Sequence, residues 1–353
     1  MTEIKWNEIL NKLVLNLDLS EEEATLAMDS MLDGRATDSQ LGAFLVGLKA
    51  KGETPVELAG FLKSIIDKGI PCNYEDPDSL LDTCGTGGDR SGTFNISTTA
   101  ALVLAGCGVK VAKHGNRAAT SKSGSADVLE ALGVAVDLGP EGVKRCIDTA
   151  NIGFFLAQKY HPAFKNVGIV RKELGIPTAF NMLGPMANPA RASNQLIGVT
   201  SEIIAEKIRD VLALMGTKRA MIVTSKDGLD EISTVDITKV FTLSTIKGFP
   251  ERSIFEIDPS NYGFSPASRT DLMGGSPEEN ADIILDVLKG SKGPKRDVVI
   301  LNAAAGLSIV KQAEEIEDGL EIAARSIDSG KALDALNLLI KVSNEALAAE
   351  GRN

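Results

Sequence analysis

The sequence predicts an α/β protein in which a small all-helical N-terminal domain precedes a larger domain with a central, mostly parallel sheet. The first 70 or so residues carry only helical signals. After Pro71, apolar segments of strand length alternate with amphipathic segments of helical length. Strands that alternate with helices are typical of a parallel sheet covered on both faces. The 353 residues are enough to build both parts around a substantial core.

Residues 1–71 predict a bundle of about four helices. Helix starts are marked by three capping-box pairs: Ser20 with Glu23, Thr37 with Gln40, and Thr54 with Glu57. Apolar residues then recur at helical spacing over 41–48 and 58–65. We therefore expect residues 1–71 to form a helical domain.

The larger domain, residues 72–353, opens with a change to strand patterns. Parallel strands are expected at 80–84, 109–112, 152–157, 195–199 and 220–224. Residues 238–244 and 254–258 are expected to add antiparallel strands, and helices dominate from Pro277 onward. We find no internal repeat or low-complexity tract that would separate further units.

The segment 164–184 does not fit the sheet pattern. A helix over about 162–174 precedes the loop IPTAFNMLGPMANPA. We expect helix and loop to return to the N-terminal bundle, so that residues 164–184 complete the small domain.

Charge and composition exclude several classes of function. The net charge of −11 and the pI near 4.9 oppose nucleic-acid binding, while a local basic patch can still bind a small phosphorylated molecule. Aromatic residues make up 4% of the chain, too few for a base-stacking platform. No apolar run reaches the roughly 20 residues of a membrane span, and the chain start lacks the pattern of a secretory signal. We therefore expect a cytoplasmic protein without nucleic-acid or membrane partners.

The cysteines and histidines indicate neither zinc binding nor a nucleophilic triad. The four cysteines form no CxxC pair and are too sparse for a disulfide framework. The two histidines, His114 and His161, each follow or end a predicted strand, so either could line a pocket, although a lone histidine is more often structural. No GxSxG nucleophile motif stands between a strand and a helix.

The first candidate site is DTCGTGGDRSGTFNIST, residues 82–98, a glycine-rich loop between a strand and a helix that starts near Ser97. Glycines let backbone N–H groups approach an anion, and a helix N-terminus adds unpaired donors. We expect Gly88 to permit such an approach and to have a φ that a larger residue disfavours. A dinucleotide fingerprint is broken at Arg90, and the Lys-Ser or Lys-Thr of a Walker loop is missing. The alternative is a plain connection between strand and helix.

The second candidate is KHGNRAATSKSG, residues 113–124, which we call the KHGNR loop. It also lies between a strand and a helix. Lys113, Arg117 and Lys122 supply positive charge, and hydroxyl and amide side chains supply neutral hydrogen bonds. The carboxyl ends of parallel strands lie at one edge of a sheet, where open α/β sheets bind ligands. Both loops are therefore expected at one anion site; the alternative for this loop is a solvated basic turn.

The third candidate is DGLDEIS, residues 227–233, after another predicted strand. The adjacent carboxylates of Asp230 and Glu231 are hard oxygen ligands, suited to Mg²⁺ held jointly with a phosphorylated substrate. The alternative is an acidic loop that is simply hydrated.

Taken together, DTCGTGGD, NIST, KHGNRAATSKSGSADVLEALG, HPA, RKELGIPTAFNMLGPMANPA and DGLDEIS resemble the anthranilate phosphoribosyltransferase family. The motifs are in the family's order and the resemblance covers nearly the whole chain. It implies a nucleoside phosphorylase-like phosphoribosyltransferase fold, a homodimer, and transfer of a phosphoribosyl group from phosphoribosyl pyrophosphate to anthranilate with Mg²⁺ as cofactor, in tryptophan biosynthesis.

The resemblance also implies site residues, with no catalytic residue firmly assigned. Phosphoribosyl pyrophosphate would be bound by Gly85, Gly88, Asp89, Thr93, Asn95, Ile96, Ser97, Thr98, Lys113, His114, Gly115, Asn116, Arg117, Ala118, Ala119, Thr120, Ser121 and Ser125. Anthranilate would be bound by Gly85, Asn116 and Arg171, with His114 and His161 nearby. The metal ligands would be Ser97, Asp230 and Glu231.

Three rival functions fit less well. A pyrimidine nucleoside phosphorylase would carry a KHSTGG-type loop where this chain has DTCGTGGD. A nucleic-acid-binding relative of the same fold would need a basic face and would not need Asn116 and Arg171. A dinucleotide-dependent dehydrogenase fails at Arg90.

Overall fold

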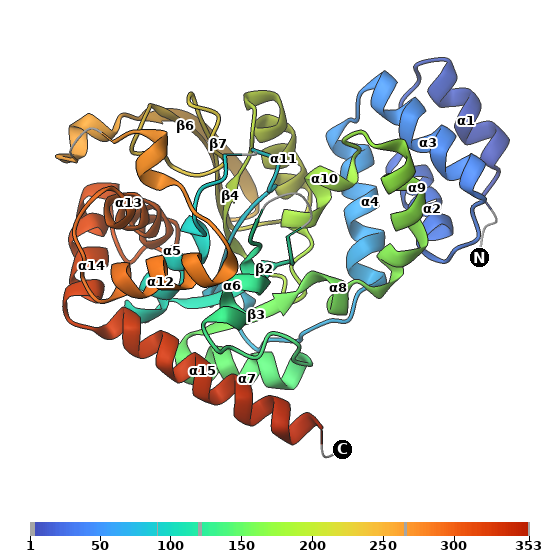
Figure 1. Cartoon of the computed structure of the whole chain (residues 1–353). Helices are drawn as coiled ribbons and strands as arrows, with labels where there is room; N and C mark the ends of the chain where they lie inside the picture. Colours follow the sequence, from blue (N-terminus) through green and yellow to red (C-terminus); the bar gives the residue numbers. More distant parts are fainter. Residues whose placement is uncertain (1–3, 90, 119–121, 265–266, 352–353) are drawn as a thin grey trace.

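The computed structural model describes residues 4–89, 91–118, 122–264 and 267–351, and it has two lobes. Figure 1 shows a bundle of helices beside a larger body in which helices surround a sheet. The predicted fold class is therefore confirmed. No helix within the described ranges is both long enough and apolar enough to cross a membrane.

The small lobe begins with four helices. They are α1 (Trp6–Val14), α2 (Glu21–Leu32), α3 (Asp38–Lys51) and α4 (Pro55–Lys68). All three capping boxes form: in α4, for example, Thr54 Oγ1 accepts from the backbone N–H of Glu57 at 3.2 Å, and the Glu57 carboxylate accepts from that of Thr54 at 2.8 Å. Large apolar residues such as Phe44 and Phe61 pack edge to face at the centre of the bundle, 5.8 Å apart.

A later segment returns to this bundle. It contains α8 (Ala157–Tyr160), η2 (Pro162–Phe164), α9 (Lys165–Leu174), α10 (Phe180–Leu183) and η3 (Gly184–Met186). Helix α9 packs on α2 and α3, Asn166 Nδ2 donates to the carbonyl of Leu32 at 2.7 Å, and Val167 and Val170 are buried among the bundle residues. This packing supports our proposal that residues 1–71 and about 164–184 form one domain and that 72–353 form the other.

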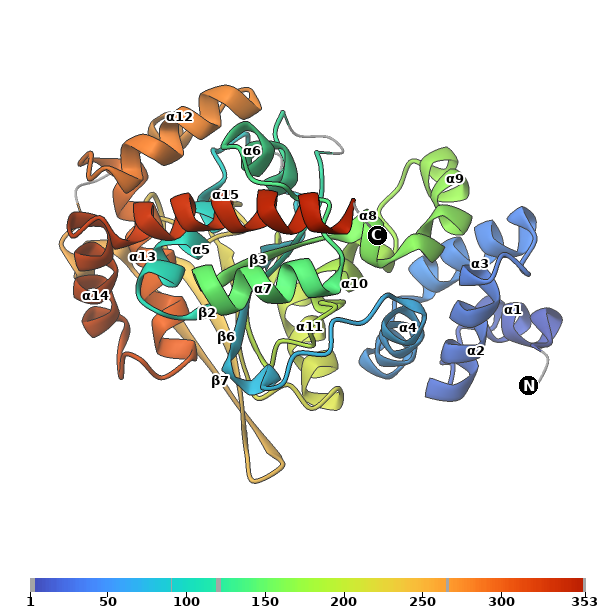
Figure 2. The same ribbon diagram turned by 90° about the horizontal axis from the view of Figure 1, so that it is seen from below.

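The large lobe is built on a seven-stranded sheet of order β3-β2-β1-β4-β5-β6-β7. The strands are β1 (Leu80–Gly85), β2 (Lys110–Gly115), β3 (Ile152–Leu156), β4 (Asn194–Gly198), β5 (Arg219–Ser225), β6 (Thr238–Ile246) and β7 (Phe249–Ile257). The first five are parallel, and β6 and β7 are antiparallel, as the sequence predicts. The β6–β7 hairpin is longer than expected and projects from the body (Figure 2).

Helices cover the sheet on both faces. One buried cluster joins one face of the sheet to α5 (Ile96–Gly106), α6 (Ser125–Ala131), α7 (Pro140–Ala150), α12 (Pro277–Leu288), α13 (Pro294–Ile309), α14 (Ile316–Asp328) and α15 (Lys331–Glu350). The other face packs on α11 (Glu202–Leu214), which in turn contacts α4. The bundle core is thus continuous with one layer of the large lobe. Short 3₁₀ turns are η1 (Pro77–Ser79), η4 (Pro259–Tyr262) and η5 (Arg269–Leu272).

Candidate functional site

The loop after β5, residues 227–233, lies against the carboxyl ends of β1 and β4. We call it the acidic loop. The backbone N–H of Gly87 donates to Asp230 Oδ2 at 2.9 Å. A Cβ on Gly85 would lie 2.8 Å from Asp230 Oδ2, and one on Gly198 would lie 1.5 Å from the Asp230 carbonyl oxygen. Glycine at both positions therefore allows the acidic loop to approach the strand ends.

The second carboxylate of this loop reaches the start of α5. The backbone N–H of Ser97 donates to Glu231 Oε1 at 3.2 Å. Burial raises the pKa of Glu231 to about 7, although the charge of Lys113 opposes the shift. Burial, and then the charges of Asp89 and Glu231, raise the pKa of Asp230 well above its usual range. Two desolvated carboxylates that repel each other make a place that favours a cation.

The glycine loop is tied to the segment around η5. Thr93 forms a bridge to Met273, and its hydroxyl lies 3.1 Å from that of Ser91. A pocket opens between the glycine loop and the acidic loop, lined by Asp89, Ser91, Thr93, Asp227, Gly228, Leu229, Arg269 and Leu272. A Cβ on Gly88 would make only ordinary contacts, the nearest with Thr200 Cγ2 at 3.7 Å, and Gly88 does not have a positive φ, so our expectation for its backbone is wrong. The positive φ values of this loop belong to Gly87, at +65°, and Gly92, at +69°.

Asn95 connects the glycine loop to the KHGNR loop. Its Oδ1 accepts from Asn280 Nδ2 at 2.9 Å and from the hydroxyl of Ser123 at 3.3 Å, and its Nδ2 donates to the Ser123 carbonyl at 3.4 Å. The two ends of the KHGNR loop also meet, because a Cβ on Gly115 would lie 2.2 Å from Ser125 Oγ. These bonds hold the two predicted loops side by side.

Side chains at the tip of the KHGNR loop bond within the loop and to α6. Asn116 Oδ1 accepts from the backbone N–H of Arg117 at 2.9 Å. The guanidinium of Arg117 pairs with Glu130, at 2.7 Å for Nη2, and lies 3.6 Å from Asp127. Asp127 also accepts from the backbone N–H of Ala118 at 2.8 Å. The carboxylates of α6 thus partly neutralise the positive charge predicted here.

Lys113 points into the sheet instead of into solvent. Its side chain is buried, and Nζ donates to the Thr83 carbonyl at 2.5 Å. Burial lowers the pKa of Lys113, while the charges of Asp82 and Glu231 oppose that shift. The ammonium group therefore lies between the start of the glycine loop and the acidic loop.

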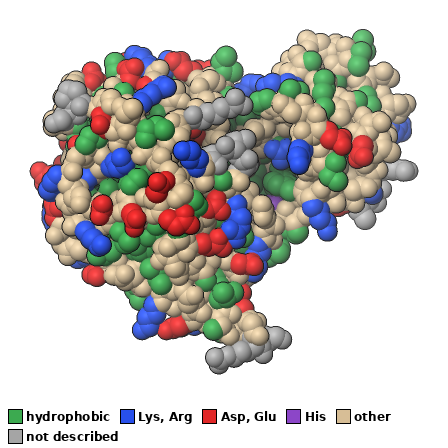
Figure 3. Space-filling view, viewed as in Figure 1, with side chains coloured by type: hydrophobic (Ala, Val, Ile, Leu, Met, Phe, Trp, Pro, Cys, Tyr) green, Lys and Arg blue, Asp and Glu red, His purple; other side chains and the backbone are tan. Residues whose placement is uncertain are grey.

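Four rings contact one another in a row, which we call the ring ladder: His114, His161, Phe164 and Phe180. The row begins on β2 and ends on α10, beside Arg171 of α9. The rings of His114 and His161 are 5.4 Å apart, His161 stacks on Phe164 at 5.4 Å, and Phe164 meets Phe180 edge to face at 5.6 Å. The guanidinium of Arg171 lies over the ring of Phe180, 4.8 Å from its centroid. Figure 3 shows a histidine at the bottom of the hollow between the two lobes. The ladder thus connects the KHGNR loop to the small lobe.

The groups of this ladder are desolvated. Burial, and then the neighbouring His161, lower the pKa of His114 to about 3, and burial lowers the pKa of His161. Burial also lowers the pKa of Arg171. Among the residues that the structure describes, none forms an ion pair or a hydrogen bond with the Arg171 guanidinium.

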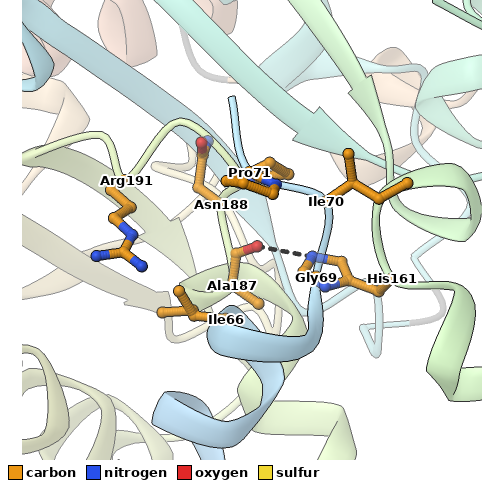
Figure 4. Close-up of a pocket in the computed structure, with 9 residues that line it drawn as sticks. Ile66, Gly69, Ile70, Pro71, His161, Ala187, Asn188 and Arg191 are labelled. Atoms are coloured by element: carbon orange, nitrogen blue, oxygen red, sulfur yellow. Dashed lines mark hydrogen bonds between the residues drawn. The ribbon is translucent and has the colours of Figure 1, made fainter. Parts of the chain in front are cut away.

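A smaller pocket lies on the other side of His161, where the chain crosses between the lobes (Figure 4). It is lined by Ile66, Gly69, Ile70, Pro71, His161, Ala187, Asn188, Pro189 and Arg191. His161 Nε2 lies 2.8 Å from the Ala187 carbonyl oxygen and donates to it, since a carbonyl can only accept. The crossing segments are thereby bonded to the ring ladder.

The structure brings most of the predicted site residues to one edge of the sheet. The acidic pair meets Gly85 and Ser97, and His114 meets His161. Among the described residues, Arg171 is connected to the KHGNR loop through the intervening rings. Ile96 and Thr98 are buried on α5. Ala119, Thr120 and Ser121 lie outside the described residues, as does Arg90.

Four supporting residues were not singled out from the sequence. They are Asp82, Asn188, Gly198 and Asn280. Asp82 had a signal, since it is a charged residue inside the otherwise apolar strand segment LLDTC. The other three form contacts to residues far away in the chain; Asn188 lies within the motif RKELGIPTAFNMLGPMANPA, but its residue type alone does not mark it.

Comparisons with known proteins agree with these motifs. Residues 77–333 match the glycosyl transferase family, a/b domain, and residues 7–69 match its helical bundle domain. An anthranilate phosphoribosyltransferase from Methanocorpusculum labreanum is 50% identical over 336 residues, covering 95% of this chain and 97% of the relative. The crystal structure of the Thermus thermophilus anthranilate phosphoribosyltransferase is similar with a TM-score of 0.87 and 36% identity, covering 95% of this chain and 99% of that one. The Saccharomyces cerevisiae enzyme in complex with PRPP and Mg is similar with a TM-score of 0.88 and 28% identity, covering 98% and 99% of the two chains.

Proposed function

This chain belongs to the anthranilate phosphoribosyltransferase family, and we propose that the loops after β1, β2 and β5 bind its substrates and metal. The enzyme transfers the phosphoribosyl group of 5-phosphoribosyl 1-pyrophosphate to anthranilate, giving N-(5-phosphoribosyl)anthranilate and pyrophosphate in tryptophan biosynthesis. Its metal cofactor is Mg²⁺. The observation that carries the site proposal is the meeting of a glycine loop, a basic loop and an acidic pair at the carboxyl edge of one parallel sheet.

The glycine loop and the KHGNR loop are proposed to hold phosphoribosyl pyrophosphate. The start of α5 and the segment around Gly88 would present backbone N–H groups to phosphate oxygens, although the N–H groups of Gly87 and Ser97 donate to Asp230 and Glu231 in this structure. Lys113 and Asn95 lie where these loops meet. The positive groups and N–H donors would balance the charge of the phosphates, so the acidic net charge of the chain does not prevent binding.

The acidic pair fits a magnesium ion. Asp230 and Glu231 are desolvated carboxylates with raised pKa values, and the Ser97 hydroxyl belongs to the residue whose N–H already bonds to Glu231. The described residues contain no group of three or more acidic, histidine or cysteine side chains that could hold a metal alone. The remaining ligands would therefore be substrate oxygens and water, as Mg²⁺ usually requires. When bound, Mg²⁺ supplies charge neutralisation for the pyrophosphate leaving group.

Anthranilate is proposed to bind between the lobes, beside the ring ladder. The guanidinium of Arg171, which has no polar partner among the described residues, is suited to bind its carboxylate, and the two neutral histidine rings can pack against its aromatic ring. Asn116 and Gly85 would approach the same molecule from the phosphate loops. The aromatic amine is a usable nucleophile when neutral, so the chain would position the reactants without a general base. We propose displacement with an oxocarbenium-like transition state and inversion at the anomeric carbon.

A homodimer and a cytoplasmic location complete the proposal. Large apolar side chains are exposed on the small lobe, including Val14, Leu15 and Ile169, and exposed apolar surface favours association with a second copy. The four cysteines are free thiols, which suits a reducing compartment. Light scattering at several protein concentrations measures the dimer directly.

Loss of anthranilate fluorescence, measured with and without phosphoribosyl pyrophosphate and Mg²⁺, tests the function. We expect anthranilate to be consumed only when both are present. Consumption without phosphoribosyl pyrophosphate would contradict the proposed reaction.

A further inference from the structure

Strands β1 and β2 separate before they reach the site. They pair only at Leu80 with Lys110 and at Leu81 with Val111. By contrast, β1 pairs with β4 at five positions, up to Gly85 with Gly198, and β2 pairs with β3 at five positions. The gap between β1 and β2 therefore opens toward the carboxyl ends, where the glycine loop and the KHGNR loop begin.

Three side chains bond to the backbone groups along this gap. Asp82 Oδ1 accepts from the backbone N–H of His114 at 3.0 Å. Asn188 Nδ2 donates to the Ala112 carbonyl at 2.7 Å, and Lys113 Nζ donates to the Thr83 carbonyl at 2.5 Å. Asp82, Lys113 and Asn188 are 0%, 2% and 1% exposed, so no solvent can replace these partners.

Asp82 and Asn188 also bond to each other, and their hydrogen bonds fix the orientation of both side chains. Asn188 Nδ2 donates to Asp82 Oδ2 at 2.8 Å, and Asn188 Oδ1 accepts from the backbone N–H of Ala190 at 2.9 Å. The amide cannot flip without losing three of these bonds. The preceding residue, Ala187, accepts from the His161 ring, so the crossing segment is also bonded to His161.

We propose that Asp82 is a positioning residue for phosphoribosyl transfer. Together with Asn188 it bridges the gap between β1 and β2 and orients Lys113 and His114 near the end of β2, just before the tip of the KHGNR loop. Its negative charge, like that of Glu231, opposes the lowering of the pKa of the buried Lys113. This proposal rests on the assignment of the KHGNR loop to phosphoribosyl pyrophosphate made above. Asp82 touches no substrate and acts through Lys113 and His114.

The first test is Asp82→Asn. The amide oxygen can still accept from His114, but the new NH₂ group faces the NH₂ group of Asn188, and the charge beside Lys113 is lost. We expect kcat/KM for phosphoribosyl pyrophosphate to fall about tenfold to a hundredfold. Calorimetry should show weaker binding of phosphoribosyl pyrophosphate in the absence of anthranilate. Asn188→Ala, which keeps the Asp82 charge but removes its donor, should cause a loss in the same direction.

Glu57→Gln is the matched control. Glu57 is a fully buried carboxylate in the bundle that accepts from the backbone N–H groups of Leu19 at 2.9 Å and Thr54 at 2.8 Å. The substitution Glu57→Gln replaces a buried carboxylate by an amide, as Asp82→Asn does, but far from the carboxyl edge of the sheet. We expect it to lower the melting temperature and to leave the kinetic constants of the folded enzyme unchanged.

Hydrogen exchange separates this proposal from the proposed function. The His114 amide should exchange slowly in the native protein and much faster in Asp82→Asn, and Glu57→Gln should not change it. An inactive native protein would count against the proposed function and leave this measurement intact. The positioning role is overturned if Asp82→Asn and Asn188→Ala both keep native kcat, KM and His114 exchange, or if they lose only thermal stability as Glu57→Gln does.

Discussion

The backbone N–H of Ser97 donates a hydrogen bond to Glu231 at 3.2 Å, across 134 positions of sequence. The first N–H groups of a helix have no partner within the helix and attract negative charge. Ser97 belongs to the first turn of α5, so Glu231 lies where an anionic group is favoured. The bond joins the acidic loop to the helix that follows the glycine loop, and a change in Glu231 therefore affects both.

The double variant Asp230→Asn with Glu231→Gln removes both carboxylates of the acidic pair and keeps their size. We expect turnover to fall on the order of a hundredfold or more, because charge stabilisation of the leaving pyrophosphate is lost. A titration of activity against Mg²⁺ measures the effect. Asp236→Asn, an exposed acid before β6, is the control and should behave as the native enzyme. Native turnover of the double variant at limiting Mg²⁺ would remove the pair from the mechanism.

His114 should remain neutral at every pH at which the protein is folded and active, and His161 should bind its proton only below its ordinary pKa. Burial lowers the pKa of His114 to about 3 and also lowers the pKa of His161. The unfolded chain binds these protons near pH 6.5, so below that pH the two groups make the folded state progressively less stable relative to the unfolded state. Since the chain has only two histidines, ring NMR signals from pH 8 to pH 5 can be followed without ambiguity. A signal that titrates with a midpoint near 6.5 in the folded protein contradicts the expectation.

Gly198→Ala should displace the acidic loop. The new Cβ would lie 1.5 Å from the Asp230 carbonyl oxygen, so backbone atoms have to move. We expect a loss of stability of about 1–3 kcal/mol and weaker Mg²⁺ dependence of activity, measured by thermal unfolding and by Mg²⁺ titration.

Gly168→Ala is the control for this substitution. Gly168 lies inside α9, has nothing within 4 Å of its would-be Cβ, and does not have a positive φ. Alanine there should raise stability by about 0.5–1 kcal/mol, because it favours the helix more than glycine does. The steric account of Gly198 fails if both variants behave alike.

The layered fold could be predicted because its signals are local. Each capping box, such as that of Thr54 and Glu57, lies within four residues, and each strand has its own apolar run. The first half of β7 was not predicted, because it lacks such a local signal. Its residues FPERS are exposed at the sheet edge and contain a proline, so they show neither alternation nor an apolar run.

The predicted loops could be identified, but not the contacts that hold them. Motif residues such as Gly85 and Asp230 stand out by their type and position. Asp82 and Asn188 are 106 positions apart, and their bond depends on how far β1 and β2 separate. The ring ladder between His114 and Arg171 likewise depends on the return of α9 to the bundle. Both contacts depend on how distant segments pack against each other, and the order of residue types along the chain does not show this packing.

The guanidinium of Arg171 packs on an aromatic ring, and it has no hydrogen-bond partner within the part of the chain that the structure describes. Its guanidinium lies 4.8 Å from the centroid of Phe180, and no ion pair to it is found within the described ranges. Burial lowers its pKa, so a charged partner is favoured. A carboxylate can accept two parallel bonds from this group, which the point charge of lysine does not reproduce.

Arg171→Ala should therefore raise KM for anthranilate about tenfold to a hundredfold, since charge-assisted bonds contribute roughly 1.5–3 kcal/mol. Affinity for phosphoribosyl pyrophosphate, measured by calorimetry, should stay nearly native, because Arg171 forms no bond to the described residues of the glycine loop or the KHGNR loop. Arg171→Lys should raise KM for anthranilate almost as much as Arg171→Ala does. Lys172→Ala, which changes an exposed neighbour on α9, should leave this KM native. Asn116→Ala should weaken both substrates, because its loop faces both. If Arg171→Ala weakens phosphoribosyl pyrophosphate and spares anthranilate, the two subsites are assigned the wrong way round.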